Sequence, residues 1–393
     1  MITETEEAII QEWMDKDLSR LAFELSSSEI SVSFISDQVK GRRKIKEKFP
    51  FLESVEGFVF PPYLSVEQSS SQFTAFAKSQ LIQGSKILDM TGGMGIDAHF
   101  LAKTNSHYTL IEKDANLVDV NRHNFNLQNV SNVDIICDDS KSYLEKTDDT
   151  YDVIYIDPAR RSVDGSNKKV FLLEDLRPNV LAIQESLWAK AQDIWIKLSP
   201  LIDISYLISA FGKIREIIVL SVKNEVKEVL VHLSESMEEG VKSERIAMDI
   251  NRNSMLSMIS DDLRAPTRID NFQGFGQYLY EPSKAIIKAQ LADCAAEKCG
   301  LNKLQSNTFF YSLNSQVGNW QGRIFKMDRI LSARPKQFRK DFPYKKANII
   351  SRNHPMNAKT IAKKYALTEG GDRYILAFSD VNGRHLISAK RIQ

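Results

Sequence analysis

The sequence is poor in cysteine and contains no long apolar run. Three cysteines in 393 residues, Cys137, Cys294 and Cys299, are too few for a disulfide framework, and the last two lack partners at zinc-binding spacing. No apolar stretch approaches the roughly 20 residues that a transmembrane helix requires. The acidic start MITETEEAIIQEW has no basic region followed by an apolar segment, unlike a signal peptide. These absences predict a cytoplasmic protein without a disulfide scaffold, a metal site or a membrane anchor.

The net charge is also small, at +1, but the charge is unevenly distributed. The segment from Gln321 to Lys364 holds 13 lysines and arginines against two aspartates, a surplus of +11, so the rest of the chain carries −10. A second basic run, KGRRKIKEK, spans residues 40–48. Such runs are either a solvated face or a contact surface for a polyanion such as RNA. Four aromatic residues lie among the charges of the longer segment and could stack on bases or form a core: Phe325, Phe338, Phe342 and Tyr344.

The hydrophobic pattern changes twice along the chain. The first 70 or so residues have apolar positions at helical spacing, and a further helix, capped by Ser65, is predicted for residues 65–82. From Lys86 short strands alternate with helices, which predicts an α/β doubly wound sheet at about 72–240. The last two strands, residues 214–222 and 226–234, must form a hairpin, so one antiparallel strand is expected at the end of the parallel sheet. Residues 347–393 predict a small α+β unit.

Acidic residues follow four successive predicted strands. The first strand ends in LDMTGGMGID, where Asp89 precedes a glycine-rich turn into a helix. Glycines let the backbone approach a ligand closely, and the start of the helix offers free N–H groups. Glu112 ends the second strand, 23 residues after Asp89, where a carboxylate can accept both hydroxyls of a ribose. Asp138 follows the third strand and Asp157 the fourth, so the four acids together predict one binding rim.

Two ligand classes fit such a rim, a dinucleotide and S-adenosylmethionine. Dinucleotide turns have the spacing G-x-G-x-x-G, whereas this chain has D-x-x-G-G-x-G and a closing hairpin. Both features resemble the class I S-adenosylmethionine-dependent methyltransferases, which have a Rossmann-like parallel sheet with one antiparallel strand. The resemblance implies a methyltransferase with S-adenosyl-L-methionine as cofactor. It places Glu112 and the adjacent Lys113 at the ribose, Asp138 at the adenine and Asp157 beside the methyl donor. The turn residues that it places against the methionine part are Asp89, Thr91, Gly92, Gly93 and Gly95.

The end of the fourth strand, YDVIYIDPARRS, resembles the D/N-P-P-x motif of that family, with Ala159 in place of the second proline. Asp157 can accept a hydrogen bond from an amino group, and the rigid Pro158 fixes the neighbouring carbonyl as a second acceptor. The resemblance therefore implies catalytic roles for Asp157, Pro158 and Arg160. Arg160 and the following Arg161 could contact phosphate or form a structural ion pair.

D-P-P-R is also similar to the motif of the C5-pyrimidine RNA methyltransferases. Those enzymes need a cysteine nucleophile in an S-C-N-P stretch after the fifth strand. The corresponding stretch here is KLSP, residues 197–200, which has no cysteine. The sequence therefore argues against covalent C5 chemistry and favours methylation of a nitrogen.

Three stretches outside the α/β domain extend the resemblance to nearly the whole chain. They are FPPYLSVEQSSSQFTAFAK, YLYEPSKAIIKAQL and ANIISRNHPMNAKTIAKKYALTEGGDRYILAFS. They are similar to a bacterial group of class I methyltransferases with a helical N-terminal region, a ferredoxin-like insert and a C-terminal THUMP-like domain. The boundaries predicted on this basis are 1–71 for the helical region, 72–240 for the S-adenosylmethionine-binding domain, 241–344 for the ferredoxin-like linking domain and 345–393 for the THUMP-like α+β domain.

The leading hypothesis is an RNA-directed methyltransferase that modifies an exocyclic or ring nitrogen of tRNA or rRNA, with residues 321–364 as the RNA contact. One alternative is a methyltransferase for a protein or a small molecule, whose C-terminal part is a structural lid. The other is a non-catalytic module that binds S-adenosylmethionine or RNA, which the intact Asp157-Pro158 pair argues against. The sequence gives neither the substrate atom nor the oligomeric state.

Overall fold

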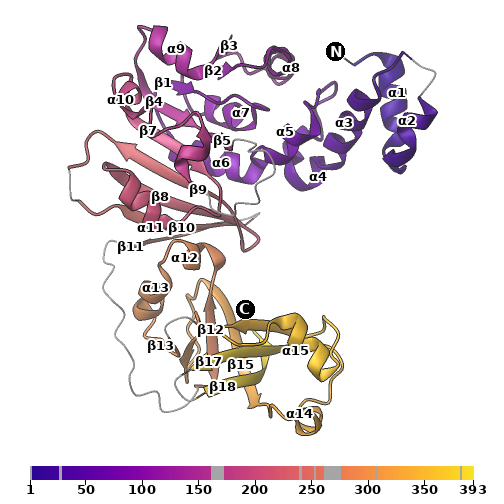
Figure 1. The fold of residues 1–393 in the computed structure, drawn as a ribbon, viewed down its shortest axis with the longest axis vertical. Coiled ribbons are helices and arrows are strands. Elements are labelled where there is room, and N and C mark those ends of the chain that lie inside the picture. The colour runs from indigo at the N-terminus through magenta and orange to yellow at the C-terminus, as the bar shows by residue number, and fades with distance from the viewer. Residues whose placement is uncertain are drawn as a thin grey trace. The chain divides into compact units, whose positions relative to one another are not determined.

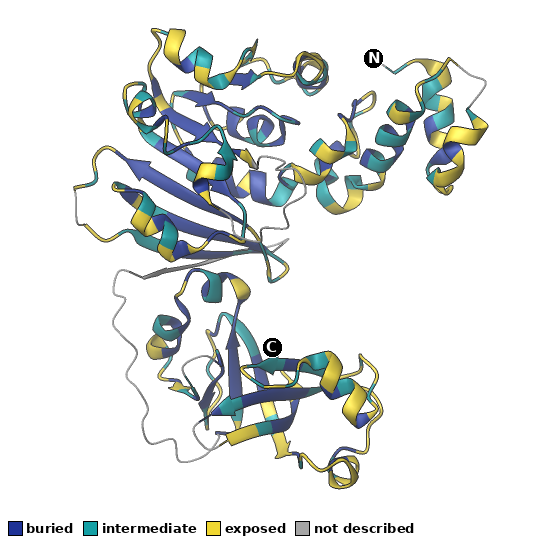
Figure 2. Cartoon of the chain, in the orientation of Figure 1, coloured by how far each residue is buried: buried dark blue, intermediate teal, exposed yellow. Residues whose placement is uncertain are grey.

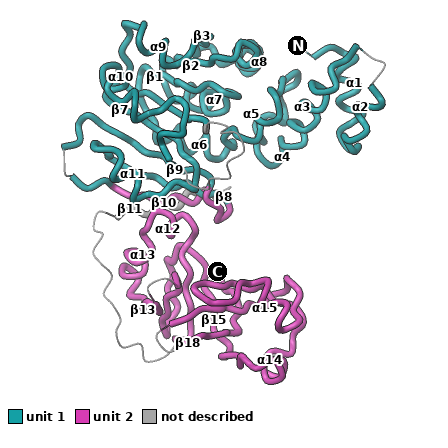
Figure 3. Tube along the Cα trace, viewed as in Figure 1, with its two compact units in different colours: residues 1–222, 227–243, 252–254 teal, residues 223–226, 244–251, 255–393 magenta. Residues whose placement is uncertain are grey.

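The chain folds into two compact units (Figure 3). Unit 1 comprises Met1–Val222, Lys227–Ser243 and Arg252–Ser254, and unit 2 comprises Lys223–Val226, Glu244–Asn251 and Met255–Gln393. The computed structural model describes residues 2–25, 29–160, 172–238, 241–251, 254–260, 276–305, 308–380 and 383–393. No helix among these residues is long and apolar enough to cross a membrane.

Unit 1 begins with short helices, as the apolar spacing predicts. They are α1 (Glu4–Trp13), α2 (Leu21–Glu24), α3 (Val32–Arg43), α4 (Ile45–Lys48), α5 (Tyr63–Gln68) and α6 (Gln72–Leu81), with 3₁₀ turns at Leu18–Arg20 and Pro50–Leu52. The single helix predicted from Ser65 is wrong: α5 ends at Gln68, and α6 begins anew with Ser71 as its N-cap. The Ser71 hydroxyl accepts the backbone N–H of Thr74, which stabilises this second start.

The sheet of unit 1 has the predicted parallel core (Figure 1). Its seven strands are β1 (Lys86–Asp89), β2 (His107–Glu112), β3 (Val133–Cys137), β4 (Tyr151–Ile156), β7 (Ala191–Leu198), β8 (Ile214–Val222) and β9 (Glu225–Ser234). Within the unit they follow the order β8-β9-β7-β4-β1-β2-β3. Strand β1 pairs parallel with β2 and β4, β2 with β3, and β4 with β7. Figure 2 shows these strands as largely buried, except β3 at the edge of the sheet, which is only partly buried.

The antiparallel strand of this sheet lies between two other strands and not at the end, where it was predicted. β9 runs antiparallel to β7 and separates it from β8. Seven consecutive residues of β9, from Glu228 to Ser234, are buried, as suits an interior strand covered on both faces. The predicted hairpin is confirmed, because Lys223 and Asn224 both have positive φ, the geometry of a tight two-residue turn.

Helices connect the strands of the sheet. They are α7 (Ile96–Ala102), α8 (Ala115–Leu127), α9 (Ser140–Lys146), α10 (Gln184–Trp188) and α11 (Ile204–Ala210). A small ribbon pairs β5 (Ala159–Arg160) with β6 (Leu176–Arg177), and a 3₁₀ turn spans Leu173–Asp175. The strands β10 (Glu244–Asn251) and β11 (Ser254–Ser260) follow β9 in the chain.

Unit 2 contains a seven-stranded sheet of order β13-β14-β12-β15-β18-β17-β16. Its elements are β12 (Tyr278–Pro282), α12 (Lys284–Lys288), α13 (Ala292–Lys298), β13 (Asn302–Lys303), β14 (Tyr311–Leu313), β15 (Gly322–Ile330), α14 (Pro335–Asp341), β16 (Asn348–Arg352), α15 (Ala358–Tyr365), β17 (Arg373–Asp380) and β18 (Gly383–Arg391). The strand, helix, strand and strand predicted after residue 347 are therefore confirmed. Strand β15 pairs with both β12 and β18, so one sheet joins residues on the two sides of the boundary predicted at 344.

Candidate active site

The strand order brings the four predicted acids to one edge of the sheet. Strands β4, β1, β2 and β3 are consecutive neighbours and parallel, so their carboxyl ends lie together. Asp89 and Glu112 are the last residues of β1 and β2, while Asp138 and Asp157 directly follow β3 and β4. The candidate site is built on this rim.

The glycine-rich turn after β1 packs tightly against β2. A Cβ atom at Gly92 would lie 2.6 Å from Cδ2 of Leu110, so only glycine fits there without a shift. Gly93 and Gly95 have φ angles of +50° and +76°, which residues other than glycine rarely adopt. Asn121 of α8 donates a hydrogen bond from Nδ2 to the carbonyl of Gly93 at 2.9 Å, which fixes the turn from the other side.

Asp89 and Glu112 both accept hydrogen bonds from this turn. Asp89 is 1% exposed; its Oδ1 accepts the backbone N–H of Thr91 at 2.9 Å, and its Oδ2 accepts the hydroxyl of Tyr108 at 2.9 Å. Glu112 is partly exposed; its Oε2 accepts the N–H of Gly93 at 2.8 Å. Burial raises the pKa of Asp89 to about 7, although the bonds from Thr91 and Tyr108 favour its ionised form. Asp89 is thus a buried support of the turn, whereas Glu112 also faces solvent.

The remaining predicted cofactor residues lie further along the rim. Asp138 is partly exposed, accepts the N–H of Asp139 at 2.8 Å and lies 3.6 Å from Nζ of Lys146. Lys113 is exposed. In the β2–β3 register Glu112 is opposite Cys137, the last residue of β3. Asp138 is therefore only one residue further along the sheet edge than Glu112.

Asp157 is held from two directions. Its backbone N–H donates to Oγ1 of Thr91 at 2.7 Å, which joins the D-P-A-R turn to the glycine turn. Its Oδ2 forms an ion pair with Nζ of Lys197 on β7. Pro158 is buried. Arg160 lies in β5, but its side chain, like all of Arg161, is outside the described residues.

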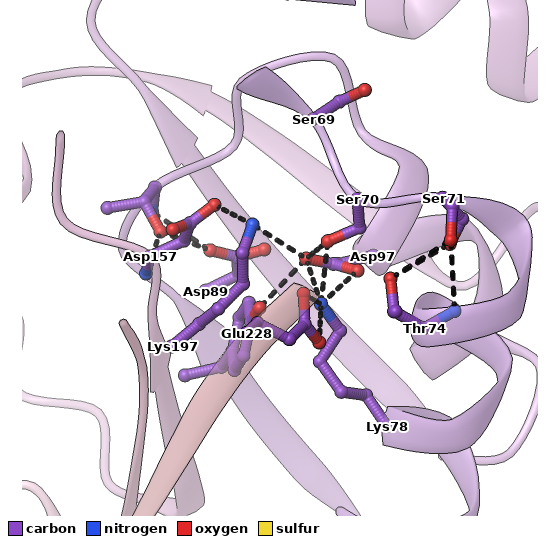
Figure 4. A network of polar contacts seen from close by, with 12 residues as sticks. Ser69, Ser70, Ser71, Thr74, Lys78, Asp89, Asp97, Asp157, Lys197 and Glu228 are labelled. Atoms are coloured by element: carbon purple, nitrogen blue, oxygen red, sulfur yellow. Dashed lines mark hydrogen bonds and ion pairs between the residues drawn. The ribbon is translucent and has the colours of Figure 1, made fainter. Parts of the chain in front are cut away.

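Lys197 connects Asp157 to a second, buried group of charges (Figure 4). Its Nζ lies 3.9 Å from Asp97 on α7. Asp97 pairs at 2.8 Å with Lys78 on α6, and Lys78 pairs at 3.0 Å with Glu228 on β9. Two hydroxyls complete the group: those of Ser70 and Tyr155 each donate to Oδ2 of Asp97 at 2.8 Å.

The two lysines determine how this group titrates. Burial disfavours the Asp97 carboxylate, but the ammonium groups of Lys78 and Lys197 outweigh it and lower its pKa to about 2. Burial likewise disfavours the charged form of Lys197, but the carboxylates around it, Asp157 first, raise its pKa well above the ordinary value. At neutral pH Lys197 is therefore an ammonium group, able to hold Asp157 but unable to accept a proton.

Sequence reasoning missed Lys197, Asp97, Lys78 and Glu228. Lys197 did carry a signal, because it is a charged residue inside the apolar strand IWIKL. Asp97 stands two residues after the glycine turn, a further acid at that end of β1. Lys78 and Glu228 are 150 residues apart, and no local pattern connects them.

Three family models match parts of the chain, and one of the solved structures that match it aligns over nearly its whole length. Residues 58–196 match the family described as "Conserved hypothetical protein 95", residues 278–319 a ferredoxin-like domain and residues 322–391 a THUMP domain-like family. A crystal structure from Porphyromonas gingivalis W83, of a protein assigned as a methyltransferase, superimposes with a TM-score of 0.85 at 26% identity. That alignment covers 99% of this chain and 98% of the other. These matches identify the chain as a methyltransferase with the class I fold and a THUMP domain-like part.

The methyltransferases of this class take their methyl group from S-adenosylmethionine, which is therefore the cofactor of the chain. Two other structures align over less than half of it. A Streptococcus mutans protein assigned as a methyltransferase, in complex with SAH, shares 12% identity over 41% of this chain and 94% of its own (TM-score 0.30). A Pyrococcus abyssi tRNA (uracil-54, C5)-methyltransferase shares 18% identity over 44% of this chain and 39% of its own (TM-score 0.30). TM-scores this low establish no further likeness. No curated protein gives a significant match.

The close packing of the turn yields a stability prediction. Gly92→Ala should lower the free energy of unfolding by about 1–3 kcal/mol, because its Cβ would overlap the Leu110 side chain. Gly212→Ala is the matched control, since no atom lies within 4 Å of its added Cβ, and it should change stability little. Urea unfolding of both variants measures the difference. Equal stabilities would contradict the packing described here.

The buried carboxyl of Asp89 makes stability depend on pH. Its pKa of about 7 in the folded protein lies above the ordinary 3.8, so its contribution to stability is complete below about pH 4 and is lost as pH rises through 7. Between pH 5 and 8 the wild type should lose about 2–3 kcal/mol of unfolding free energy that Asp89→Asn keeps. The exposed Asp119→Asn is the control. Urea unfolding measures the unfolding free energy of both proteins at each pH. If this free energy changed equally with pH in the wild type and in Asp89→Asn, the assignment would be refuted.

Proposed function

We propose that the chain is an RNA methyltransferase that transfers the methyl group of S-adenosylmethionine to a nitrogen of tRNA or rRNA. The observation that carries the proposal is the Asp157-Pro158 turn, held beside the glycine turn by Thr91 and Lys197. The Asp157 side chain is 34% exposed, and among the described residues only its Oδ2 is ion-paired. Oδ1 is left to accept a hydrogen bond from a substrate amine. An RNA substrate would place the protein in the cytoplasm.

The residues at the rim fit the adenosyl cofactor. The glycine turn keeps side chains away from the end of β1, and Glu112 and Asp138 follow neighbouring strands with partly exposed carboxylates. A carboxylate has about four lone-pair sites, so Glu112 can hold the N–H of Gly93 and still accept ribose hydroxyls. In this assignment Lys113 lies beside the ribose, Asp138 accepts the adenine amino group, and Asp89 with Thr91 shapes the turn.

The chain's own residues then have simple tasks in the transfer. A substrate nitrogen donates its lone pair to the methyl carbon; the N–C bond forms as the C–S bond breaks, and the nitrogen later loses a proton to water. Asp157 holds the amine in line and stabilises the positive charge that develops on it. Lys197 stays protonated and positions Asp157, and it does not act as a base.

The positions of the cysteines support nitrogen as the target. The fifth parallel strand, β7, ends in Lys197 and Leu198, where an enzyme of the C5 class would need its nucleophile nearby. Cys137 ends β3, three strands away from β4 in the sheet order. Cys294 and Cys299 lie at α13 in unit 2. In the described part of unit 1 no cysteine therefore follows β4 or β7.

The basic segment 321–364 and the THUMP domain-like match at 322–391 support RNA as the substrate. The structure narrows how this segment could bind. Phe325, Phe338 and Phe342 are buried in two hydrophobic cores of unit 2, so they cannot stack on bases. Tyr344 is exposed, but the Arg373 guanidinium lies 5.0 Å from its ring centre. The contact with RNA would rest mainly on charge.

The substrate class can be tested by methyl transfer from a labelled donor. We expect the purified protein to label the RNA fraction of cells that lack the gene, and not their protein or metabolite fractions. Calorimetry should show micromolar binding of S-adenosylmethionine, an affinity typical of small ligands. Label in protein alone would favour the protein-substrate alternative, and donor binding without any transfer would favour a non-catalytic module.

Asp157→Ala should lower the methyl-transfer rate roughly 100-fold or more, because it removes the group that stabilises charge on the amine. Donor binding should stay within a few-fold of the wild type. Asp148→Ala, an exposed aspartate in the loop before β4, is the matched control and should leave the rate unchanged.

A second variant separates nitrogen from C5 chemistry. Replacing Cys137, Cys294 and Cys299 by serine should leave the rate intact, because no covalent intermediate forms on a nitrogen substrate. A folded cysteine-free variant that binds the donor but transfers nothing would overturn the nitrogen assignment.

A further inference from the structure

A cavity of about 940 Å³ in unit 2 is lined by basic side chains. They are Lys223 from the turn between β8 and β9, Lys284 from α12, Arg323 from β15, Arg352 from β16 and Arg384 from β18. His354 lines it as well. Among the described residues, no acidic side chain belongs to the lining. The residues come from both the ferredoxin-like and the THUMP domain-like matches, so the cavity belongs to neither alone.

One buried carboxylate fixes two of these cations. Glu281 of β12 is 1% exposed; its Oε2 accepts Nε–H of Arg323 at 2.7 Å, and its Oε1 lies 2.9 Å from Nη2 of Arg352. A single negative charge thus holds two guanidinium groups and leaves a surplus of one positive charge at the cavity wall. Because the side chains are held in place, they lose little entropy when they bind an anion.

Two of the other cations, Lys284 and Arg384, have no such partner. Lys284 and Arg384 are exposed, and neither forms an ion pair with any residue that the structure describes. The charge of Arg384 is felt at His354: burial lowers the pKa of His354, a hydrogen bond to the Met356 carbonyl opposes this, and the charges of Arg384 and of the nearby Lys364 lower it further. The wall therefore has an uncompensated positive charge.

The lining also indicates what kind of anion would fit. Its non-basic members include Ile349, Ile350 and Pro355 but no Phe, Tyr or Trp, so the lining favours contacts with phosphate over stacking on bases. Arginine side chains bind phosphate oxygens through paired N–H donors, and lysine binds them as a point charge. A volume of this size has room for more than one phosphate group.

We propose that this cavity binds phosphate groups of the RNA strand and is the principal charge contact of unit 2 with its substrate. The proposal rests on the proposed function. It places the contact at the lining residues and not on the exposed face of α14, whose cations Lys336, Arg339 and Lys340 are not among the lining residues.

The test compares two charge-reversal pairs. Lys284→Glu with Arg384→Glu changes the cavity, and Lys336→Glu with Arg339→Glu changes the exposed face of α14 by the same net charge. All four side chains are exposed and outside the Glu281 cluster, so both variants should fold, which unfolding curves check. Binding of a labelled single-stranded RNA of roughly 20 nucleotides is measured by anisotropy over a salt series, and binding of S-adenosylhomocysteine by calorimetry.

We expect the cavity pair to weaken RNA binding at least tenfold at low salt. It should also make the slope of log affinity against log salt concentration shallower by about 1.4, the value for two lost phosphate contacts on a single strand. The α14 pair should change affinity less than threefold, and neither pair should alter binding of S-adenosylhomocysteine. Unchanged RNA affinity in the cavity pair, or equal losses in both pairs, would overturn the proposal.

Two further outcomes identify which proposal fails. In the first, inorganic tripolyphosphate is titrated into the wild type and into the cavity pair. If it binds tightly only to the wild type, while both proteins bind RNA equally well, the cavity serves a small phosphate compound and the proposal is wrong. In the second, a cavity variant binds RNA as tightly as the wild type and still transfers methyl groups to it. This outcome would contradict the cavity proposal and leave the proposed function standing. Transfer only to protein or metabolites would remove the proposed function and this proposal with it.

Discussion

The pairing of Lys197 with Asp157 and Asp97 is the interaction on which the candidate site depends. A buried charge is costly unless it is paired, and removing one partner of a buried ion pair typically costs about 3–5 kcal/mol because the other is left uncompensated. Lys197 has carboxylates from two different elements as neighbours, so it fixes α7 and the end of β4 relative to β7. The position of the D-P-A-R turn is therefore coupled to the folding of the whole sheet edge.

The position of β9 inside the sheet also brings a charged residue to the buried group around Lys197. Because β9 lies beside β7, Glu228 reaches Lys78, and Lys78 in turn reaches Asp97 and the hydroxyl of Ser70. Ser70 is available for this bond because the chain leaves the helical path between α5 and α6. The break in the predicted helix and the interior place of the antiparallel strand thus both supply groups to one buried network.

The parts of the fold that could be predicted are those encoded by local patterns. Period-two and helical apolar spacing locate most strands and helices of unit 1 and those of residues 347–393, and parallel strands bring Asp89, Glu112, Asp138 and Asp157 to one edge. Partners distant in the chain, such as Lys78 and Glu228, leave no such pattern, because only the folded sheet brings them together. Lys197 is visible in the sequence as a charge in an apolar strand, but nothing near it in the chain indicates that its partners are Asp157 and Asp97.

The carboxylates of the rim and the positive charge of residues 321–364 would serve different parts of the proposed reaction. The rim has four carboxylates, which attract hydroxyl and amino donors but repel the phosphates of a nucleic acid strand. In the proposed function, Lys197 offsets this repulsion at Asp157, where the substrate nitrogen would come closest. A strand still needs positive charge elsewhere to hold it, and the chain concentrates +11 in residues 321–364 while the remainder sums to −10. Separating these charges lets the rim stay selective for the donor and the amine, because the affinity for the strand does not have to come from the site itself.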